Sequence, residues 1–416
     1  MSPTTARGGG VVERYIELGL ALGRHIDGLV DAYYGPSEPA ARATVGTMAT
    51  PAALADDARV LLADIDAGVP LDENPVAVAS GSPPGADGRR RRWVSAQVTG
   101  LRTTARRLAG EQISYADEVE WCYGVRPRPV PEEEFAAAHE RLGQALPGSG
   151  PLAERFVTWR ETHAVAPDRL PKAISSLADD FRQRTSALFG LPDGERVDFE
   201  LVRDEPWSGF NYYLGGLCSR VAINTDLPVL STSLAHLVAH EAYPGHHTEH
   251  CRKEVGLVRQ HRWMEESIFL VGTPQCLLAE GLADLGLEVI VGRRPEEVVA
   301  AHLRPLGIRY DADVVAAVSQ AAEALSNARA NAAWRLHVDG ADPDVVTDEL
   351  ARWSLVARPR AEKAVEFLRH PTWRAYITCY VEGLRLCRRF VDGDPRRFAR
   401  LVSEQLVPAD LNAEPA

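Results

Sequence analysis

Hydrophobic residues recur at three- and four-residue steps along most of the chain, which is the period of amphipathic helices. In the first such segment, 11–33, Leu18 and Leu22 belong to this stripe, and Gly35-Pro36 follows as a stop signal. The same period predicts helices over 51–66, 91–110, 115–123, 131–145, 150–163, 171–190, 229–243, 245–256, 261–270, 273–291, 295–304, 311–337, 343–353, 358–369 and 372–391. The pattern therefore predicts a mostly α protein.

The period changes from helical to alternating within 196–225. Val197, Phe199 and Leu201 alternate with acidic residues, which is typical of a half-buried strand, and 219–224 alternates again. Two short strands directly before a histidine-rich helix predict a small β-sheet beside that helix.

The chain shows one long break in this pattern, at 67–88, where Gly, Pro, Asp and Ser are frequent. We expect a flexible linker there. No period of 20–50 residues repeats, which argues against a solenoid. We therefore expect a single large, mostly helical domain over 1–416, with two lobes around a cleft and a catalytic core over 196–391.

Composition narrows the class of protein. The 416 residues are 45% hydrophobic and 25% charged, with a formal net charge of -12, which argues against broad nucleic-acid or anionic-membrane binding. No run of about 18 apolar residues predicts a membrane span. The six cysteines are scattered, and the first ten residues lack the apolar core of a secretory signal. We therefore expect a cytoplasmic protein with reduced thiols.

Candidate chemistry is concentrated in 233–250, which holds five of the twelve histidines. His240-Glu241 ends an apolar helical run, and His246 and His247 follow closely. Neutral imidazole is a good zinc ligand, and a glutamate beside it can act as a base. In the common H-E-x-x-H pattern, two histidines lie one helical turn apart on one face. The second histidine comes later here, so the site must be built differently.

The residues between the histidines predict a bend. Pro244 breaks a helix and restricts the residue before it, and Pro244-Gly245 can start a new helix. On a straight helix, six residues span about 9 Å, too far for two imidazoles that share one zinc. A bend brings His240 and His246 together. We choose His246 as the second ligand and keep His247 in reserve.

A third ligand must come from another element. Glu280 on a later helix is our candidate, because Gly281 beside it allows close approach of a neighbouring segment. Asp284 lies one turn further along the same face, where it can support a ligating histidine. Glu241 is then the expected general base.

Two tyrosines on a late helix extend the constellation. Tyr376 and Tyr380 lie one turn apart on one face, where a hydroxyl can donate to a developing oxyanion. The alternative is that both are core aromatics. The strand Val221–Asn224 is a candidate for aligning an extended peptide by β-addition.

The chain resembles a known family. His240-Glu-Ala-Tyr-Pro-Gly-His-His247, followed by Glu280-Gly281, resembles the signature of the bacterial domain-of-unknown-function 885 family, which is similar to the thermostable carboxypeptidase Taq family and the thimet-oligopeptidase-like zinc peptidases. The resemblance extends to Ala21–Gly28, Tyr33–Pro36, Tyr212–Gly216, Ile223–Pro228 and Tyr376–Gly383. It implies a cleft-forming metallopeptidase-like fold and a zinc ion held by His240, His246 and Glu280.

The residues and the resemblance together predict a zinc-dependent peptidase that hydrolyses a peptide bond, with Glu241 as general base. Two alternatives stay open. One is a metal-dependent hydrolase of a non-peptide amide or isopeptide. The other is a non-catalytic helical protein that binds metal structurally or serves in interaction.

Overall fold

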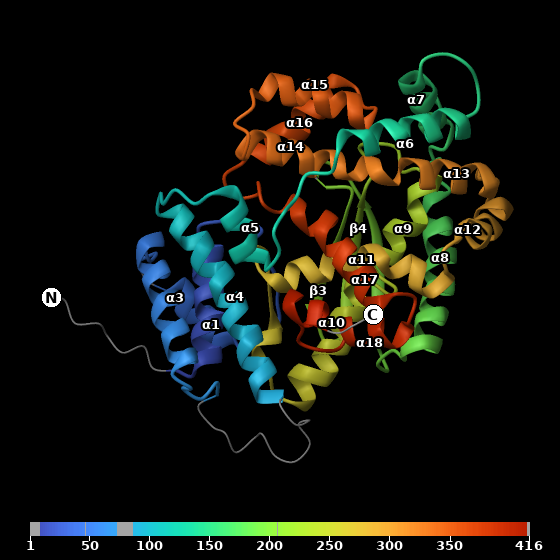
Figure 1. The fold of residues 1–416 in the computed structure, drawn as a ribbon. Helices are drawn as coiled ribbons and strands as arrows, with labels where there is room; N and C mark the ends of the chain where they lie inside the picture. Colours follow the sequence, from blue (N-terminus) through green and yellow to red (C-terminus); the bar gives the residue numbers. More distant parts are fainter. Residues whose placement is uncertain (1–8, 46, 73–85, 206, 414–416) are drawn as a thin grey trace.

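The computed structural model describes residues 9–45, 47–72, 86–205 and 207–413, and most of them are helical (Figure 1). The predicted mostly α fold is confirmed. The α-helices are α1 (Val11–Gly23), α2 (Ser37–Thr44), α3 (Pro51–Asp66), α4 (Ala86–Leu108), α5 (Tyr115–Tyr123), α6 (Glu132–Ala145), α7 (Leu152–Thr162), α8 (Leu170–Phe189), α9 (Ser231–Glu241), α10 (His246–Lys253), α11 (Pro274–Val291), α12 (Glu296–Leu303), α13 (Ala312–Ala322), α14 (Ala328–His337), α15 (Pro343–Ser354), α16 (Arg358–Arg369), α17 (Leu384–Val391), α18 (Pro395–Leu401) and α19 (Pro408–Ala413).

Within the described ranges, five strands form two small sheets. They are β1 (Val30–Tyr33), β2 (Arg196–Val202), β3 (Gly209–Gly215), β4 (Cys218–Asn224) and β5 (Ile268–Leu270). The larger sheet has the order β2-β4-β3, with β4 parallel to β2 and antiparallel to β3. The sequence predicted two of these strands and missed β3. Since β4 is hydrogen-bonded on both sides, the expected β-addition of a peptide along Val221–Asn224 is wrong.

The second sheet corrects two predicted helices. The helix expected over 11–33 ends at Gly23, and β1 pairs antiparallel with β5, which lies inside the helix expected over 261–270. All three residues of β5 are buried. A short, fully buried apolar run has no polar face, so periodicity cannot distinguish a strand from a helix there.

Other differences concern boundaries. A 3-10 turn, Glu323–Asn327, interrupts the helix expected over 311–337, and a π-helical turn, Cys379–Gly383, precedes α17 where one helix was expected. Of the linker expected over 67–88, residues 73–85 lie outside the described residues, while 86–88 belong to α4.

Helix α11 lies at the centre of this arrangement. Ten consecutive residues from Pro274 to Ala283 are buried, so the helix is covered on all sides. Figure 1 shows α9, α10 and α17 around it, with α14, α15 and α16 above and the α1–α3–α4 group to one side. Among the described helices, none has an apolar stretch that would cross a membrane.

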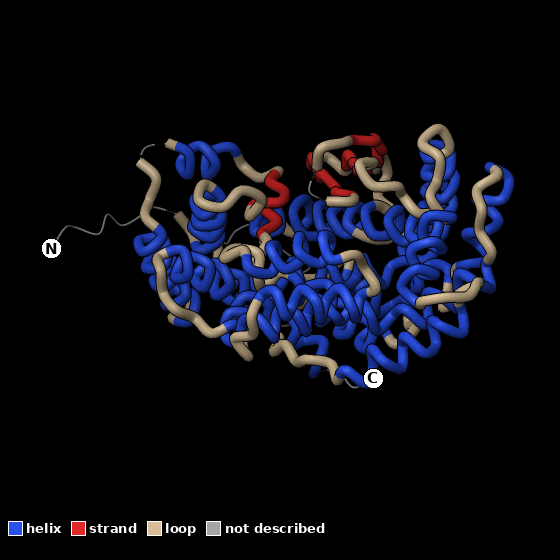
Figure 2. Tube along the Cα trace, turned by 90° about the horizontal axis from the view of Figure 1, so that it is seen from above, coloured by secondary structure: helices blue, strands red, loops and turns tan. Residues whose placement is uncertain are grey.

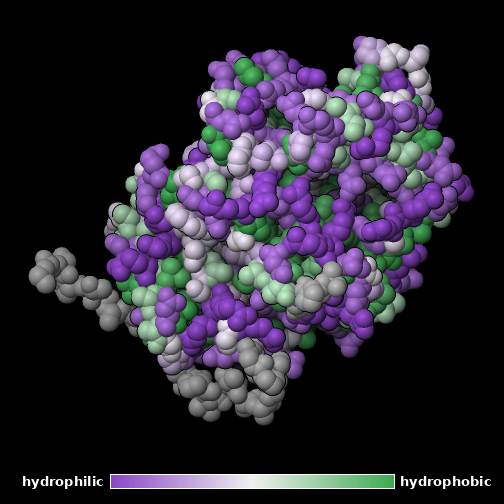
Figure 3. All heavy atoms as spheres, in the orientation of Figure 1, coloured by the Kyte–Doolittle hydropathy of each residue, from purple (hydrophilic) through white to green (hydrophobic). Residues whose placement is uncertain are grey.

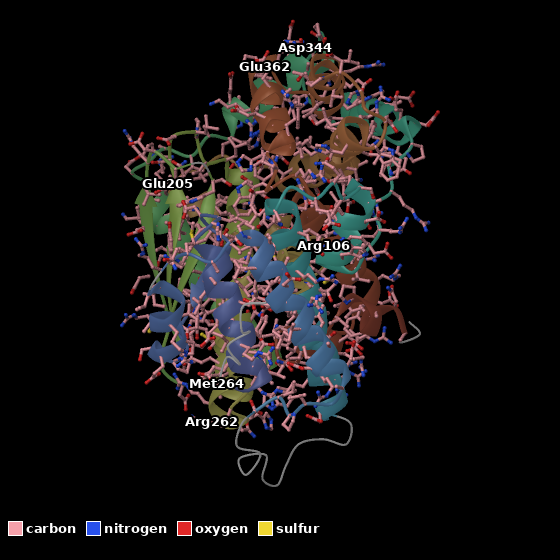
Figure 4. All side chains as sticks on the ribbon, turned by 90° about the vertical axis from the view of Figure 1, so that its left-hand side faces the viewer. Arg106, Glu205, Arg262, Met264, Asp344 and Glu362 are labelled. Carbon is pink, nitrogen blue, oxygen red and sulfur yellow. The ribbon has the colours of Figure 1, made fainter. Side chains whose placement is uncertain are left out.

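The views of the whole molecule place the sheets at one face. Seen from above, the strands of both sheets lie along one long side of a helical body (Figure 2). In the side view, Asp344 on α15 and Glu362 on α16 lie at the top of the molecule, and Arg262 and Met264 lie at the bottom (Figure 4). Glu205 lies near the ends of the strands, apart from both groups. The surface facing the viewer in Figure 1 mixes polar and apolar residues and is hollowed between its upper and lower parts (Figure 3).

Candidate metal centre

A sharp bend separates the two histidine-bearing helices. Helix α9 ends at Glu241 and α10 begins at His246. The Gly245 amide donates to the Ala239 carbonyl at 2.9 Å, which folds the chain back on itself. A Cβ at Gly245 would overlap the His240 carbonyl group, so only glycine fits this return. The bend predicted at Pro244-Gly245 is confirmed.

The bend brings three candidate ligands together. His240 Nε2 lies 3.1 Å from His246 Nε2 and 3.4 Å from Glu280 Oε2, and the nearest approach of Glu280 to His246 Nε2 is 4.0 Å. Ligand atoms bound tetrahedrally at 2.0–2.1 Å are separated by about 3.3 Å. The two shorter distances match that spacing, whereas the 4.0 Å approach to His246 is made by the other oxygen, Glu280 Oε1, so a zinc-sized cation fits between His240 and each of its two neighbours.

The carboxylate of Glu280 is the clearest indication of a cation-binding site. Its Oε1 accepts a hydrogen bond from Tyr376 at 2.8 Å, whereas its Oε2 is buried, accepts no hydrogen bond and has His240 Nε2 as its neighbour at 3.4 Å. A buried acceptor without a partner costs free energy, about 1–3 kcal/mol and more when it is charged. A cation between Glu280 and the two imidazoles would satisfy it.

Asp284 orients the first histidine. Its Oδ1 lies 2.9 Å from His240 Nδ1, which directs His240 Nε2 toward His246 and Glu280. Its other neighbour is His236, at 3.4 Å. His236, His240 and Asp284 also approach one another closely enough to hold an ion, but the His236 side chain is 49% exposed. We interpret this second group as the hydrogen-bonded support of His240.

Glu241 lies beside the same point. Its carboxylate is within 4.8 Å of the ring nitrogens of His240 and His246. Strand β3 holds the residue in place, because Asn211 Nδ2 donates to the Glu241 carbonyl at 2.6 Å. A Cβ at Gly209 would approach Glu241 Oε1 within 3.2 Å, so the strand runs close against the carboxylate. Burial raises the pKa of Glu241 to about 7.

The reserve ligand, His247, points elsewhere. Its side chain is 0% exposed, its Nδ1 lies 2.8 Å from Ser219 Oγ and its Nε2 lies 2.9 Å from Glu195 Oε2. Tyr243 also donates to Glu195 Oε2, at 2.7 Å. Both ring nitrogens are therefore engaged, and the structure brings His246 rather than His247 to Glu280.

The pKa values of the two histidines reflect the charged groups packed around them. Burial lowers the pKa of His240, but the neighbouring carboxylates of Asp284 and Glu280 outweigh it and raise that pKa well above its usual value. Burial and the neighbouring His240 lower the pKa of His246 to about 4. The carboxylates around His240 thus favour a positive charge at this point.

The two predicted tyrosines form a chain of contacts to Glu280. Tyr376 Oη donates to Glu280, and Tyr380 Oη lies 3.4 Å from Tyr376 Oη. Burial raises both pKa values well above normal, so both hydroxyls keep their protons and can donate. Tyr380 is 39% exposed, which argues against the reading of both residues as core aromatics.

Close packing sets the position of these tyrosines. A Cβ at Gly281 would overlap the Gly383 carbonyl group and come within 2.9 Å of Cys387 Sγ. Helix α11 therefore touches the π-helical turn Cys379–Gly383 backbone to backbone, as expected from the glycine beside Glu280. Such turns are frequent at functional sites.

Sequence reasoning missed several residues of this region. Asn211, which holds the Glu241 carbonyl, lies on the strand that was not predicted, and Glu195 binds His247 from a loop before β2. The aromatic residues Phe210, Tyr212 and Tyr213, a type that is frequent in strands, were the available signal for that strand.

Solved structures from three organisms are similar to this chain. A putative lipoprotein from Colwellia psychrerythraea is 15% identical, with 87% of this chain and 75% of that chain covered and a TM-score of 0.51. A putative lipoprotein of unknown function from Shewanella oneidensis is 11% identical, with 97% and 82% covered and a TM-score of 0.48. An M32 carboxypeptidase from Deinococcus radiodurans R1 is 12% identical, with 96% and 93% covered and a TM-score of 0.41.

These likenesses bear on the fold alone. At 15% identity the Colwellia match shows shared architecture, and TM-scores below 0.5 support no further argument. No protein-family model matches the chain, and no curated protein sequence matches it. Membership of the domain-of-unknown-function 885 family therefore stays a prediction.

Proposed function

We propose that the protein is a zinc-dependent hydrolase of amide bonds, with a peptide as its substrate and residues 196–391 as its catalytic core. The observation that carries the proposal is the convergence of His240, His246 and Glu280, with a buried carboxylate oxygen among them that accepts no hydrogen bond. Glu241 lies within reach of the same point.

The residues divide the chemistry among them. A zinc ion at this point would polarise a carbonyl group and lower the pKa of a water molecule. Glu241 accepts the proton of the attacking water and passes it to the leaving amine. Tyr380 donates a hydrogen bond to the oxyanion, while Tyr376 ties Glu280 in place.

The neighbouring sheet supports a peptide as substrate. Among the described strands, β3 has a hydrogen-bonded partner on one side only, and it passes directly beside Glu241. An extended chain can add to the other side of such a strand through main-chain hydrogen bonds. The peptide-aligning role that the sequence suggested for Val221–Asn224 thus moves to β3.

A specific experiment separates catalysis from metal binding. Glu241→Gln is expected to keep one zinc per chain, measured by mass spectrometry of the purified protein, and to abolish cleavage of a peptide library. Glu205→Gln, an exposed glutamate at the sheet end, is the matched control and should cleave normally. Cleavage by the Glu241→Gln variant at the wild-type rate would refute the mechanism.

One observation favours a second candidate, a structural metal anchor. Glu241 lies close enough to both imidazoles to serve as a fourth ligand, and a structural zinc site is closed by four protein ligands. In that case Glu241→Gln would lose zinc and thermal stability, and the wild-type protein would cleave no peptide.

A further inference from the structure

A cavity of about 740 Å³ lies beside the candidate metal centre. Its wall is formed by α6, α11, α13 and α17 and by the turns Glu323–Asn327 and Cys379–Gly383. Figure 1 shows α6 and α13 above α11 and α17, and the surface is hollowed between them (Figure 3). Ligand-binding pockets typically measure about 300–1,000 Å³, so the cavity is large enough for part of a substrate.

Tyr380 connects this cavity to the candidate centre. The residue lines the cavity, its hydroxyl lies 3.4 Å from that of Tyr376, and Tyr376 donates to Glu280. Strand β3 approaches the centre from another direction, because Gly209 lies against Glu241 and no described residue of β3 lines the cavity. The centre therefore lies between β3 and the cavity in this series of contacts. A peptide that pairs with β3 can cross the metal and continue past Tyr380 into the cavity.

Helix α11 sets the length of chain that the cavity can hold. Leu285 and Val289 line the cavity and come five and nine residues after Glu280, which places them about 8 and 14 Å further along the helix axis. At about 3.3 Å per residue, an extended peptide needs about three or four residues beyond the centre to reach Val289. The cavity is therefore deep enough for a short peptide segment rather than for a single residue.

The charged side chains of the wall largely neutralise one another. Arg388 of α17 lies 2.7 Å from Glu323 and 3.3 Å from Glu288. Arg385, about one turn earlier, lies 3.0 Å from Glu382. The described lining holds five arginines and four acidic residues, so it offers donors and acceptors to a peptide main chain without a large excess of either charge. The cavity can therefore select a substrate by length more than by side-chain charge.

We propose that this cavity holds about three or four substrate residues on one side of the cleaved bond, so that the protein acts on oligopeptides rather than on dipeptides or small amides. The inference rests on the proposed function and gives it a substrate class. Helix α6, which lies outside the expected catalytic core over 196–391, thereby becomes part of the substrate site.

Hydroxamate probes test the proposal without any turnover, because a hydroxamate binds a site metal and can carry a peptide of chosen length. Two series of one to five alanine residues are used. Peptidyl hydroxamates carry the residues on the N-terminal side of the metal-binding group, and succinyl hydroxamates carry them on the C-terminal side. Calorimetric titration into the zinc-loaded protein should show, in at least one series, an affinity that rises up to about the third or fourth residue and then levels off.

Two variants that fill the cavity assign this rise in affinity to it. Ser326→Trp, at an exposed position of the wall, should weaken the longest probe of that series about 10- to 100-fold and leave the one-residue probe unchanged. Gln320→Trp fills the cavity from a different element, α13, and should do the same, which excludes a local folding fault at one position. Ser186→Trp, at an exposed position of α8 outside the cavity, is the matched control and should bind every probe as the wild type does.

The outcomes separate this inference from the proposed function. An affinity that does not rise with length in either series would overturn the inference alone, because the one-residue probe would still report the metal site. A rise with length that either cavity-filling variant leaves unchanged, or a loss that is equal for all lengths, would also overturn it. If no probe binds the wild-type protein, the inference and the proposed function both fail.

Discussion

Replacing Gly281 by alanine tests whether close backbone packing positions the candidate site. The added methyl group would overlap the Gly383 carbonyl, which is backbone and cannot rotate away, and it would come within 2.9 Å of Cys387 Sγ. Restoring ordinary van der Waals contact requires α11 and the turn Cys379–Gly383 to separate by about 1 Å. Overpacking of this kind typically costs about 1–3 kcal/mol.

The same displacement has a consequence for the site. Tyr376 Oη lies 2.8 Å from Glu280 Oε1, so a shift of about 1 Å takes this pair beyond hydrogen-bonding distance. Glu280 then loses the group that holds it beside His240. We expect Gly281→Ala to weaken zinc binding about 10- to 100-fold, as the loss of groups that orient metal ligands usually does.

Urea unfolding of the metal-free protein and competitive zinc titration measure the two effects separately. Gly143→Ala is the matched control, because Gly143 lies within α6 and a Cβ there meets nothing closer than 4.0 Å. That change should stabilise the protein by up to about 1 kcal/mol, since alanine is the better helix former. If Gly281→Ala is as stable as the wild type and binds zinc equally well, the packing argument is wrong.

Two further predictions concern neighbouring groups. His246→Ala should reduce zinc affinity at least about 100-fold. His247→Ala should keep one zinc per chain but lose roughly 1–3 kcal/mol of stability, because Glu195 loses a buried hydrogen-bond partner. Equal zinc loss in both variants would contradict the choice of His246 as the ligand. Burial, opposed by Lys253, raises the pKa of Glu266 to about 7 from 4.5, so the folded protein keeps a proton that the unfolded chain releases. Glu266 should therefore make the free energy of unfolding fall as the pH rises from 4.5 to 7, by about 3 kcal/mol at most, and Glu266→Gln should remove this share of the fall. Urea unfolding at several pH values checks this, and an unchanged pH dependence in the variant would refute it.

The candidate site was predictable as far as local chain geometry reaches. Pro244 and Gly245 predict a bend, and the bend brings His246 near His240. The choice between His246 and His247 was open in the sequence, because consecutive residues at a helix start point in different directions. The structure directs them apart because Glu195 and Ser219 take both nitrogens of His247.

The sequence by itself determines three features: a mostly α chain, the break in the histidine-bearing helix, and a carboxylate-bearing helix that neighbouring segments can approach closely. The helical period of the apolar residues and the positions of glycine and proline are sufficient for all three. These follow from local sterics and from the spacing of apolar residues. Only the tertiary structure decided that β5 is a strand, that β3 supports Glu241, and that a bulge interrupts β1 at Asp31. Each of those outcomes depends on a partner more than 25 residues away, and no local pattern encodes such a contact.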